Sequence, residues 1–239
     1  MGETHAQVNR SLRPEFCTWL RDRPWDIAFL QEAPPRWLRA LCEASGASGA
    51  GALTSRNFLA PLRAAVAERN PDLIASGEGG SNQLLLRPPA HLLEVRRLTL
   101  RLRPERRRML WGRLELAEGR RLSVANLHAT AGDPPAAAED VLLAAERAVE
   151  WAGGDPLVFG GDLNLRPGRQ PETFEAFSDR FALSPSTGPG AIDHVLARGL
   201  EVVEHPAPLP AEERDVSGPR GLRLRLSDHA PVRAGFAGE

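Results

Sequence analysis

The feature that most constrains this chain is the repeated placement of polar, metal-competent residues where short apolar runs end. The segments are LQE at 30–32, SNQ at 81–83, NLH at 126–128, GDLN at 161–164, IDH at 192–194 and SDH at 227–229. A carboxylate at the end of a buried strand costs desolvation free energy unless it is paired or binds a cation. The pattern therefore favours a layered protein with one polar site at the ends of its strands.

Periodicity predicts many strands with interspersed helices. Apolar residues at helical spacing, or helix start and stop signals, predict helices at 11–23, 35–44, 59–69 and 139–152, and a short helical FEAF lies within 165–190. Alternating or continuous apolar runs predict strands at 25–33, 97–103, 109–117, 121–129, 156–164, 191–197 and 222–226. Residues 205–221 are expected to form a long loop. Such a mixture indicates α and β elements in one layered domain.

Composition excludes several classes of protein. The 239 residues carry a net charge of −1, and all 30 basic side chains are arginine. A chain without lysine cannot use a Schiff-base lysine or a Walker-type phosphate loop. Two cysteines cannot form a disulfide framework, no apolar run is long enough to span a membrane, and the first residues lack the apolar region of a secretory signal. We therefore expect a cytoplasmic protein.

Several familiar site types are missing from the sequence. It has no cysteine and histidine spacing typical of structural zinc, no HExxH, no GxSxG and no GxGxxG after a strand. The polar segments instead offer carboxylate and amide oxygens together with histidines. Hard oxygen ligands suit Mg²⁺ or Mn²⁺.

The alternation of side chains along a strand helps to distinguish candidate catalytic residues from residues that pack in the core. Asn126 and His128 share one face of their strand, although a lone inward histidine is more often a satisfied core residue. Asp162 and Asn164 would project to one side in extended backbone, while an Asx turn after the strand is the plainer interpretation. His194 shares the face of its apolar neighbours, so we interpret it as packing.

The ordered set LQE, NxH, GDxN, IDHV and SDHxP resembles the endonuclease/exonuclease/phosphatase superfamily, which has the deoxyribonuclease-I-like fold. The resemblance runs from about Trp25 to the C-terminus. It implies an α+β, four-layered αββα sandwich of two packed, mostly antiparallel β-sheets flanked by helices, in a single domain over 1–239. It also implies hydrolysis of a phosphoester by in-line attack of water with a divalent cation.

The same resemblance assigns roles to individual residues. Glu32 corresponds to a metal ligand and Asp228 to a further metal-site carboxylate. Asp162 corresponds to the carboxylate that activates or positions water, and Asn164 to a ligand of the phosphoryl oxygen. The family pattern also places His229 on the scissile phosphate, held by Asp193, and makes His128 a phosphate ligand or leaving-group acid. Whether Asp162 or His229 takes the proton from water stays open.

Two departures from the family pattern matter. Members usually begin with a strand ending in Trp-Asn, whose asparagine supports the metal site, and the one early candidate here is Asn9. Either Asn9 serves, or the first strand is missing or degenerate, or that ligand is absent. The chain also lacks the tyrosine that abasic-site endonucleases place at the phosphate.

Three functions are compatible with these residues. The first is a metal-dependent phosphodiesterase acting on nucleic acid, for which seven arginines among residues 96–108 offer a phosphate-binding surface. A solvated strand face in a chain without lysine is the favoured explanation of these arginines. The second is hydrolysis of a small phosphoester or a phospholipid headgroup, with 205–221 as a lid. The third is a catalytically dead binding module. The sequence does not indicate an oligomeric state.

Overall fold

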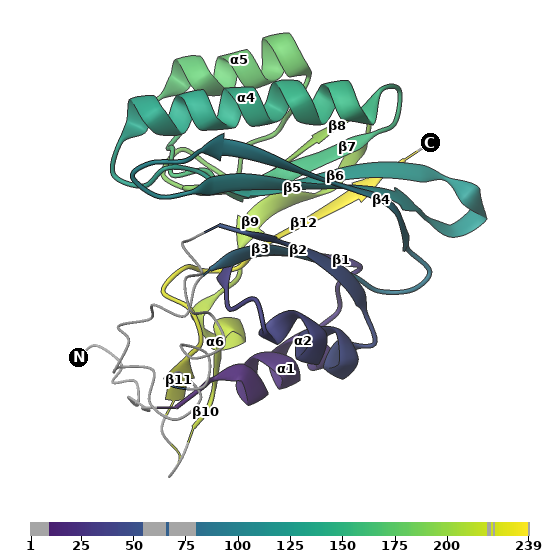
Figure 1. Ribbon diagram of the computed structural model, residues 1–239, viewed down its shortest axis with the longest axis vertical. Helices are drawn as coiled ribbons and strands as arrows, with labels where there is room; N and C mark the ends of the chain where they lie inside the picture. Colours follow the sequence, from purple (N-terminus) through teal and green to yellow (C-terminus); the bar gives the residue numbers. More distant parts are fainter. Residues whose placement is uncertain (1–9, 55–65, 67–79, 219–220, 222, 239) are drawn as a thin grey trace.

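The computed structural model describes residues 10–54, 66, 80–218, 221 and 223–238. Its elements form four layers, in which two β-sheets face each other and helices cover their outer faces (Figure 1). The chain is thus an α+β sandwich, as predicted. Among the described residues, no helix is both long enough and apolar enough to cross a membrane.

The larger sheet has five strands in the order β4-β5-β6-β7-β8. They span His91–Arg101, Arg107–Glu115, Arg121–His128, Leu157–Asp162 and Asp193–Arg198. Neighbours in this sheet pair antiparallel, except that β6 and β7 are parallel. Helix α4 (Pro134–Ala152) connects these two strands, because parallel neighbours require a crossover connection.

The smaller sheet has the antiparallel order β1-β3-β2, and a separate pair joins β9 to β12. These five strands span Ile27–Ala33, Ser81–Leu86, Ser48–Leu53, Glu201–Pro208 and Val232–Ala237. A two-stranded hairpin, β10 (Asp215–Ser217) and β11 (Arg223–Arg225), follows the short helix α6 (Ala211–Arg214). Helices α1 (Arg13–Asp22) and α2 (Trp37–Ser45) lie outside the smaller sheet, and α4 and α5 (Pro171–Phe181) lie outside the larger one (Figure 1).

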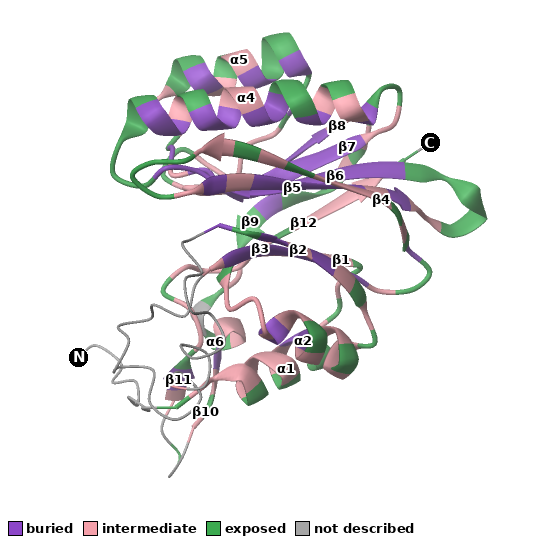
Figure 2. Ribbon diagram, in the orientation of Figure 1, coloured by how far each residue is buried: buried purple, intermediate pink, exposed green. Residues whose placement is uncertain are grey.

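Three apolar interfaces separate the four layers. The side chains of Met109, Trp111 and Phe159 pack with α4 and α5. Leu84, Leu110 and Val124 are among the side chains between the two sheets, and Leu20, Trp37 and Leu85 are among those beneath α1 and α2. Figure 2 shows the buried residues on α4, β3 and β5–β7, as expected when a sheet is covered on both faces.

The predicted elements largely match the structure, with differences that have physical causes. Strand β4 begins six residues before the predicted 97, and α4 begins at Pro134, where Asp133 caps the helix by accepting a hydrogen bond from the Ala136 N–H. The predicted helix at 59–69 lies outside the described residues apart from residue 66.

The expected long loop at 205–221 is wrong. Its first part belongs to β9, which pairs with β12, and α6 and β10 follow directly. The prolines and charges of this segment do not prevent pairing, because β9 is a largely exposed edge strand, where both are tolerated. The lid suggested for this segment is therefore not supported.

Candidate active site

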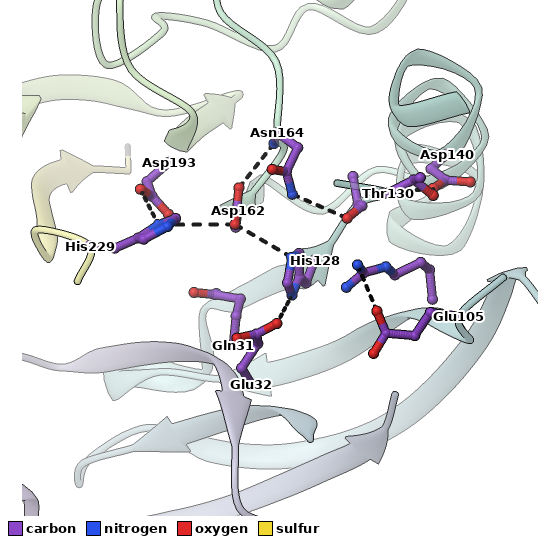
Figure 3. Close-up of polar contacts among 12 residues, drawn as sticks. Gln31, Glu32, Glu105, His128, Thr130, Asp140, Asp162, Asn164, Asp193 and His229 are labelled. Atoms are coloured by element: carbon purple, nitrogen blue, oxygen red, sulfur yellow. Dashed lines mark hydrogen bonds and ion pairs between the residues drawn. The ribbon is translucent and has the colours of Figure 1, made fainter. Parts of the chain in front are cut away.

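Strand register places three polar side chains at one level of the larger sheet. In the parallel β6–β7 pair His128 lies opposite Asp162, and in the antiparallel β7–β8 pair Asp162 lies opposite Asp193. The last residues of β6 and β7 therefore meet the first residue of β8. The site forms at this edge (Figure 3).

His229 and Asp193 form a hydrogen-bonded pair. The His229 Nδ1 lies 2.9 Å from Oδ2 of Asp193. Since a carboxylate only accepts, Nδ1 carries the hydrogen and Nε2 is left for another partner. Burial lowers the pKa of His229, but the negative charges of Asp193 and Asp162 outweigh burial, so the pKa lies above its ordinary value.

Asp162 is the buried centre of the site, with 6% of its surface exposed. Its Oδ1 accepts a hydrogen bond from the Asn164 backbone N–H at 3.0 Å, and its Oδ2 lies 3.5 Å from Nε2 of His128. Burial, followed by the negative charge of Asp193, raises the pKa of Asp162 to about 6. A carboxylate with such a pKa is ionised at pH 7 and can still accept a proton.

His128 is enclosed between two carboxylates but stays neutral. Its Nδ1 lies 3.6 Å from Oε1 of Glu32, on the side opposite Asp162. Burial is the main cause that lowers the pKa of His128 to about 3, with smaller contributions from the positive charges of Arg107 and His229. A neutral imidazole can still donate one hydrogen bond to a phosphate oxygen, whereas the role of leaving-group acid loses support.

Glu32 and Asn164 both adopt left-handed backbone conformations, with φ of 53°. Non-glycine residues seldom do so, and such strain tends to collect at functional sites. Glu32 lies within the register shift between Leu30 and Ala33 of β1. Asn164 lies beyond the end of β7, and its backbone N–H bonds to Asp162 Oδ1. Of the two alternatives that the sequence left open, the structure therefore has the Asx turn and not the extended backbone.

The remaining candidate residues are Asp228, Asn9 and the Asn164 side chain, and among the described residues neither Asp228 nor the Asn164 side chain forms a hydrogen bond or ion pair with Asp162. Asp228 adjoins His229, and its charge acts on both His229 and Asp193. Asn9 lies outside the described residues. The Asn164 Nδ2 donates to the Ala129 carbonyl at 3.2 Å, which leaves one amide hydrogen for a ligand.

His194, as expected from strand parity, is buried in the fold. Its Nδ1 accepts from the Thr187 N–H at 3.2 Å, and its Nε2 lies 3.0 Å from the Ala191 carbonyl and 3.2 Å from the Leu165 carbonyl. Burial lowers the pKa of His194. The neutral ring therefore links the backbone at Leu165, just after Asn164, to the backbone at Thr187 and Ala191, just before β8.

Two residues support the site from behind, of which the sequence analysis noted Asn126, on the face of His128, but not Asp140. Asn126 joins the two sheets, because it accepts from Gln31 Nε2 at 2.6 Å and donates to the Leu30 and Gln83 carbonyls. Asp140 on α4 accepts from both the N–H and the hydroxyl of Thr130, two residues after His128 (Figure 3). The sequence feature that could have indicated Asp140 is an aspartate within the predicted helix at 139–152.

The arginine-rich segment at 96–108, for which the sequence offers either a phosphate-binding surface or a solvated strand face, makes several contacts within the protein. Six of its seven arginines have protein partners. These are Glu94 for Arg96, the Gly51 carbonyl for Arg97, Glu139 and Asp140 for Arg101, the Thr54 carbonyl for Arg106, Glu105 for Arg107 and Thr99 for Arg108. These contacts favour the structural interpretation of the segment.

The carboxylates of the site fit a divalent cation. One ligand atom from each of Asp162, Asp193 and His229 lies within 4.8 Å of the others. The Asp193 and Glu32 charges both raise the pKa of Asp162, so the cluster holds more negative charge than its own histidines neutralise. Oxygen donors with excess negative charge are what Mg²⁺ and Mn²⁺ require. His229 Nδ1 is already occupied by Asp193, so carboxylates are the better ligands.

A comparison with protein-family models identifies the family of the chain. The model of the Endonuclease/Exonuclease/phosphatase family matches residues 8–229. The chain belongs to this family. No curated protein sequence matches it. The family's hydrolytic activity on phosphoesters therefore agrees with the chemistry of the site.

Solved structures confirm the fold of this endonuclease/exonuclease/phosphatase protein. A mannosyl-6-phosphatase from Bacteroides thetaiotaomicron is 18% identical, with a TM-score of 0.70 over 94% of this chain and 90% of that one. The human Nocturnin catalytic domain with bound sulfate is 17% identical, with a TM-score of 0.64 over 89% and 81%. TDP2 from D. rerio, complexed with single-strand DNA product, is 15% identical, with a TM-score of 0.64 over 94% and 90%.

Proposed function

We propose that the protein is a divalent-metal-dependent phosphodiesterase that uses in-line attack of water. The observation that carries this proposal is the arrangement of two differently tuned groups, the ionised Asp162 with a pKa of about 6 and the His229–Asp193 pair beside it. Neighbouring ionisable groups with perturbed pKa values in one cluster are typical of acid–base sites.

The chain's own residues divide the work as follows. Asp162 takes the proton of the attacking water, since the raised pKa of His229 favours its protonated form. His229 Nε2–H donates to a nonbridging phosphoryl oxygen, where negative charge increases in the transition state. The free amide hydrogen of Asn164 and the neutral His128 supply further donors.

By the family resemblance, a metal ion would be held by Glu32 and Asp228, whose charges act on the Asp162–Asp193–His229 cluster, with Asn9 as a further candidate ligand. Mg²⁺ or Mn²⁺, when bound, neutralises phosphoryl charge and promotes formation of the nucleophile. Asp162 lies close enough to Glu32 for their charges to interact, so the same ion would also stabilise the ionised form of Asp162.

The charge of the cluster favours diesters over monoesters. Three carboxylates, Asp193, Asp162 and Asp228, act on one cationic histidine, His229, and Glu32 lies beside the neutral His128. Arg107, whose charge reaches His128, is itself paired with Glu105. A dianionic monoester would be repelled more strongly than a monoanionic diester. Hydrolysis of a sugar phosphate is the second candidate, because a mannosyl-6-phosphatase has the same fold.

Hydrolysis of bis-p-nitrophenyl phosphate and p-nitrophenyl phosphate, with Mg²⁺, Mn²⁺ or EDTA, tests the proposal. We expect metal-dependent cleavage of the diester, and a loss of at least about 10²-fold in Asp162→Asn because the proton acceptor is removed. Asp179→Asn, an exposed carboxylate on α5, is the matched control. Cleavage of the monoester alone would favour the sugar phosphatase, and equal rates in EDTA would contradict the metal requirement.

Nucleic acid is one class of diester that the site could accept, as the DNA-bound TDP2 shows for another member of this fold. A polyanionic substrate bound by several cationic side chains would give a KM that rises steeply with salt. With most arginines of 96–108 engaged internally, we expect a shallow dependence. A steep one would favour a nuclease.

A further inference from the structure

The turn between β6 and α4 passes the active site before it enters the helix. It starts at Ala129, and Ala131 lines the same pocket as Asp162. Asp140, in the second turn of α4, contacts this turn from the other side and has 2% of its surface exposed. Its Oδ2 accepts from the N–H of Thr130 at 3.0 Å and from the hydroxyl of the same residue at 2.5 Å. The turn is therefore held between the helix and the site.

The buried charge of Asp140 is compensated by one arginine. Arg101, the last residue of β4, donates from Nε to Oδ1 of Asp140 at 3.1 Å. The same guanidinium also donates to Glu139 at 2.8 Å and to the Ala136 carbonyl at 3.2 Å. Burial of a carboxylate is costly unless such bonds satisfy it, and bonds to an ionised acceptor are about twice as strong as neutral ones. Both oxygens of Asp140 are thus fixed in place.

The bond from Thr130 to Asp140 sets the direction of a whole peptide group. The Thr130 N–H and the Ala129 carbonyl belong to one peptide unit, which is not among the cis peptide bonds of the described residues. In a planar trans peptide the N–H and the carbonyl point in opposite directions. The Ala129 carbonyl therefore points away from Asp140, and there it accepts from Asn164 Nδ2 at 3.2 Å. Figure 3 shows Thr130 between Asp140 on α4 and Asn164 of the site.

Asn164 needs such support because its backbone is strained, with φ of 53°. Two hydrogen bonds hold it, one from its own N–H to Asp162 Oδ1 at 3.0 Å and one from Nδ2 to the Ala129 carbonyl. Strained conformations persist where the surrounding structure fixes them from several sides. Loss of the second bond would release the amide whose other hydrogen is the proposed donor to the phosphoryl group.

We propose that Asp140 is a positioning residue, which acts through the Ala129–Thr130 peptide group to aim the Asn164 amide at the phosphoryl oxygen. The inference rests on the proposed function for the identity of that oxygen, whereas the contacts between Asp140 and Asn164 do not depend on it. The preceding N–H, that of Ala129, donates to the Asp162 carbonyl at 2.9 Å, so the turn is also tied to β7. Asp140 therefore supports the reaction without touching the substrate.

Steady-state kinetics with bis-p-nitrophenyl phosphate, comparing Asp140→Asn with Asp155→Asn, tests the proposal. Asp155 is the matched control, because it also accepts from an arginine Nε, that of Arg113 at 2.8 Å, but follows the C-terminal end of α4. We expect kcat of Asp140→Asn to fall about 10-fold while KM changes less than about 2-fold, since a phosphoryl donor stabilises the transition state more than the bound substrate. Asp155→Asn should keep the kcat of the unaltered protein, even where its melting temperature falls as far.

Two variants of Thr130 separate the hydroxyl from the rest of the network. Thr130→Val keeps the size of the side chain and the N–H bond but removes the hydroxyl, so kcat should fall less than in Asp140→Asn. Thr130→Ser retains the hydroxyl and should keep kcat near that of the unaltered protein. If Asp140→Asn does not fold, this pair decides, and equal kcat values for valine and serine would contradict the proposal.

The side-chain amide of Asn164 gives a readout that needs no turnover. Its signals in ¹⁵N NMR spectra can be identified by their loss in Asn164→Asp. One amide hydrogen bonds to the Ala129 carbonyl, so we expect two well-separated proton shifts in the unaltered protein and in Asp155→Asn, and a smaller separation in Asp140→Asn. This response in a protein that cleaves no diester would contradict the proposed function and support the positioning role.

Three results would overturn the proposal. An unchanged kcat in Asp140→Asn would show that the reaction does not need this carboxylate. Equal falls of kcat in Asp140→Asn and Asp155→Asn would assign the loss to general stability. Unmoved Asn164 amide signals in Asp140→Asn would show that the Ala129 carbonyl is held without Asp140.

Discussion

The imidazole of His229 donates from Nδ1 to Oδ2 of Asp193 across 2.9 Å, although the two residues lie 36 positions apart in the chain. The bond joins the start of β8 to the segment before β12. It fixes the ring so that Nε2 is free, and it stabilises the imidazolium form.

Asp193→Asn should weaken both effects of this bond. An amide oxygen can still accept from Nδ1, but the negative charge is lost, so the pKa of His229 should fall. Because protonated His229 binds the phosphoryl group, activity is expected to decline as pH rises through that pKa, and in the variant this decline should begin at lower pH. We expect turnover to fall roughly 10- to 100-fold. A pH–rate profile with an unmoved alkaline limb would contradict the role of Asp193.

The sequence can single out the catalytic candidates because their signal is local. An aspartate after an apolar run, or a histidine in phase with inward residues, can be recognised within a few positions, as for Asp162 and His128. Their alignment across β6, β7 and β8 is not local, because it depends on strand register. The structure supplies that register.

Among the elements that escaped prediction, β2 and β9 did so for different reasons. Strand β2 reads SGAGAL, which lacks the β-branched and aromatic residues typical of strands. A Cβ on Gly49 would lie 2.6 Å from the Leu84 carbonyl oxygen, so close approach to β3 requires a small residue there. Strand β9 was interpreted as loop because tertiary pairing with β12 overrides its turn-forming residues.

His194→Gln should reduce stability more than activity. The ring holds three backbone groups, and glutamine cannot reproduce all three bonds, so we expect a loss of about 1–3 kcal/mol in the free energy of unfolding. Turnover at temperatures well below melting should stay near that of the unaltered protein. A large loss of turnover with normal melting would show that His194 takes part in the reaction.

The same residue should make the fold sensitive to acid. The pKa of His194 is lower in the folded than in the unfolded chain, and the pKa of His128 is lowered to about 3. As pH falls below about 6.5, the unfolded chain takes up protons at these two histidines that the folded chain does not, so their contribution to stability falls, whereas the raised pKa of Asp162 acts in the opposite direction. Denaturant titrations between pH 7 and 4.5 should show a shallower decline in His194→Gln. Parallel curves for the two proteins would contradict this expectation.

Gly161→Ala should disrupt the strand that carries Asp162. Gly161 has φ of 128°, and a Cβ there would lie 2.0 Å from the Leu127 carbonyl oxygen on the neighbouring strand. Backbone cannot move aside cheaply, so we expect melting to fall by about 10 °C or more, or soluble protein to be lost. Gly154→Ala is the matched control, because a Cβ there meets no atom within 4 Å. Equal melting of the two variants would show that β7 tolerates a side chain at Gly161.

Metal binding should stabilise the fold through the carboxylates of the site. A ligand bound only by the folded state raises the free energy of unfolding by about 2.7 kcal/mol at 100 times its dissociation constant. Mg²⁺ or Mn²⁺ should therefore raise the melting temperature above its value in EDTA. In Glu32→Gln the rise should shrink or vanish, while melting in EDTA should stay level or increase, because one charge that acts on Asp162 is removed. Asp179→Asn should respond to metal as the unaltered protein does. A full metal response in Glu32→Gln would show that the ion binds without Glu32.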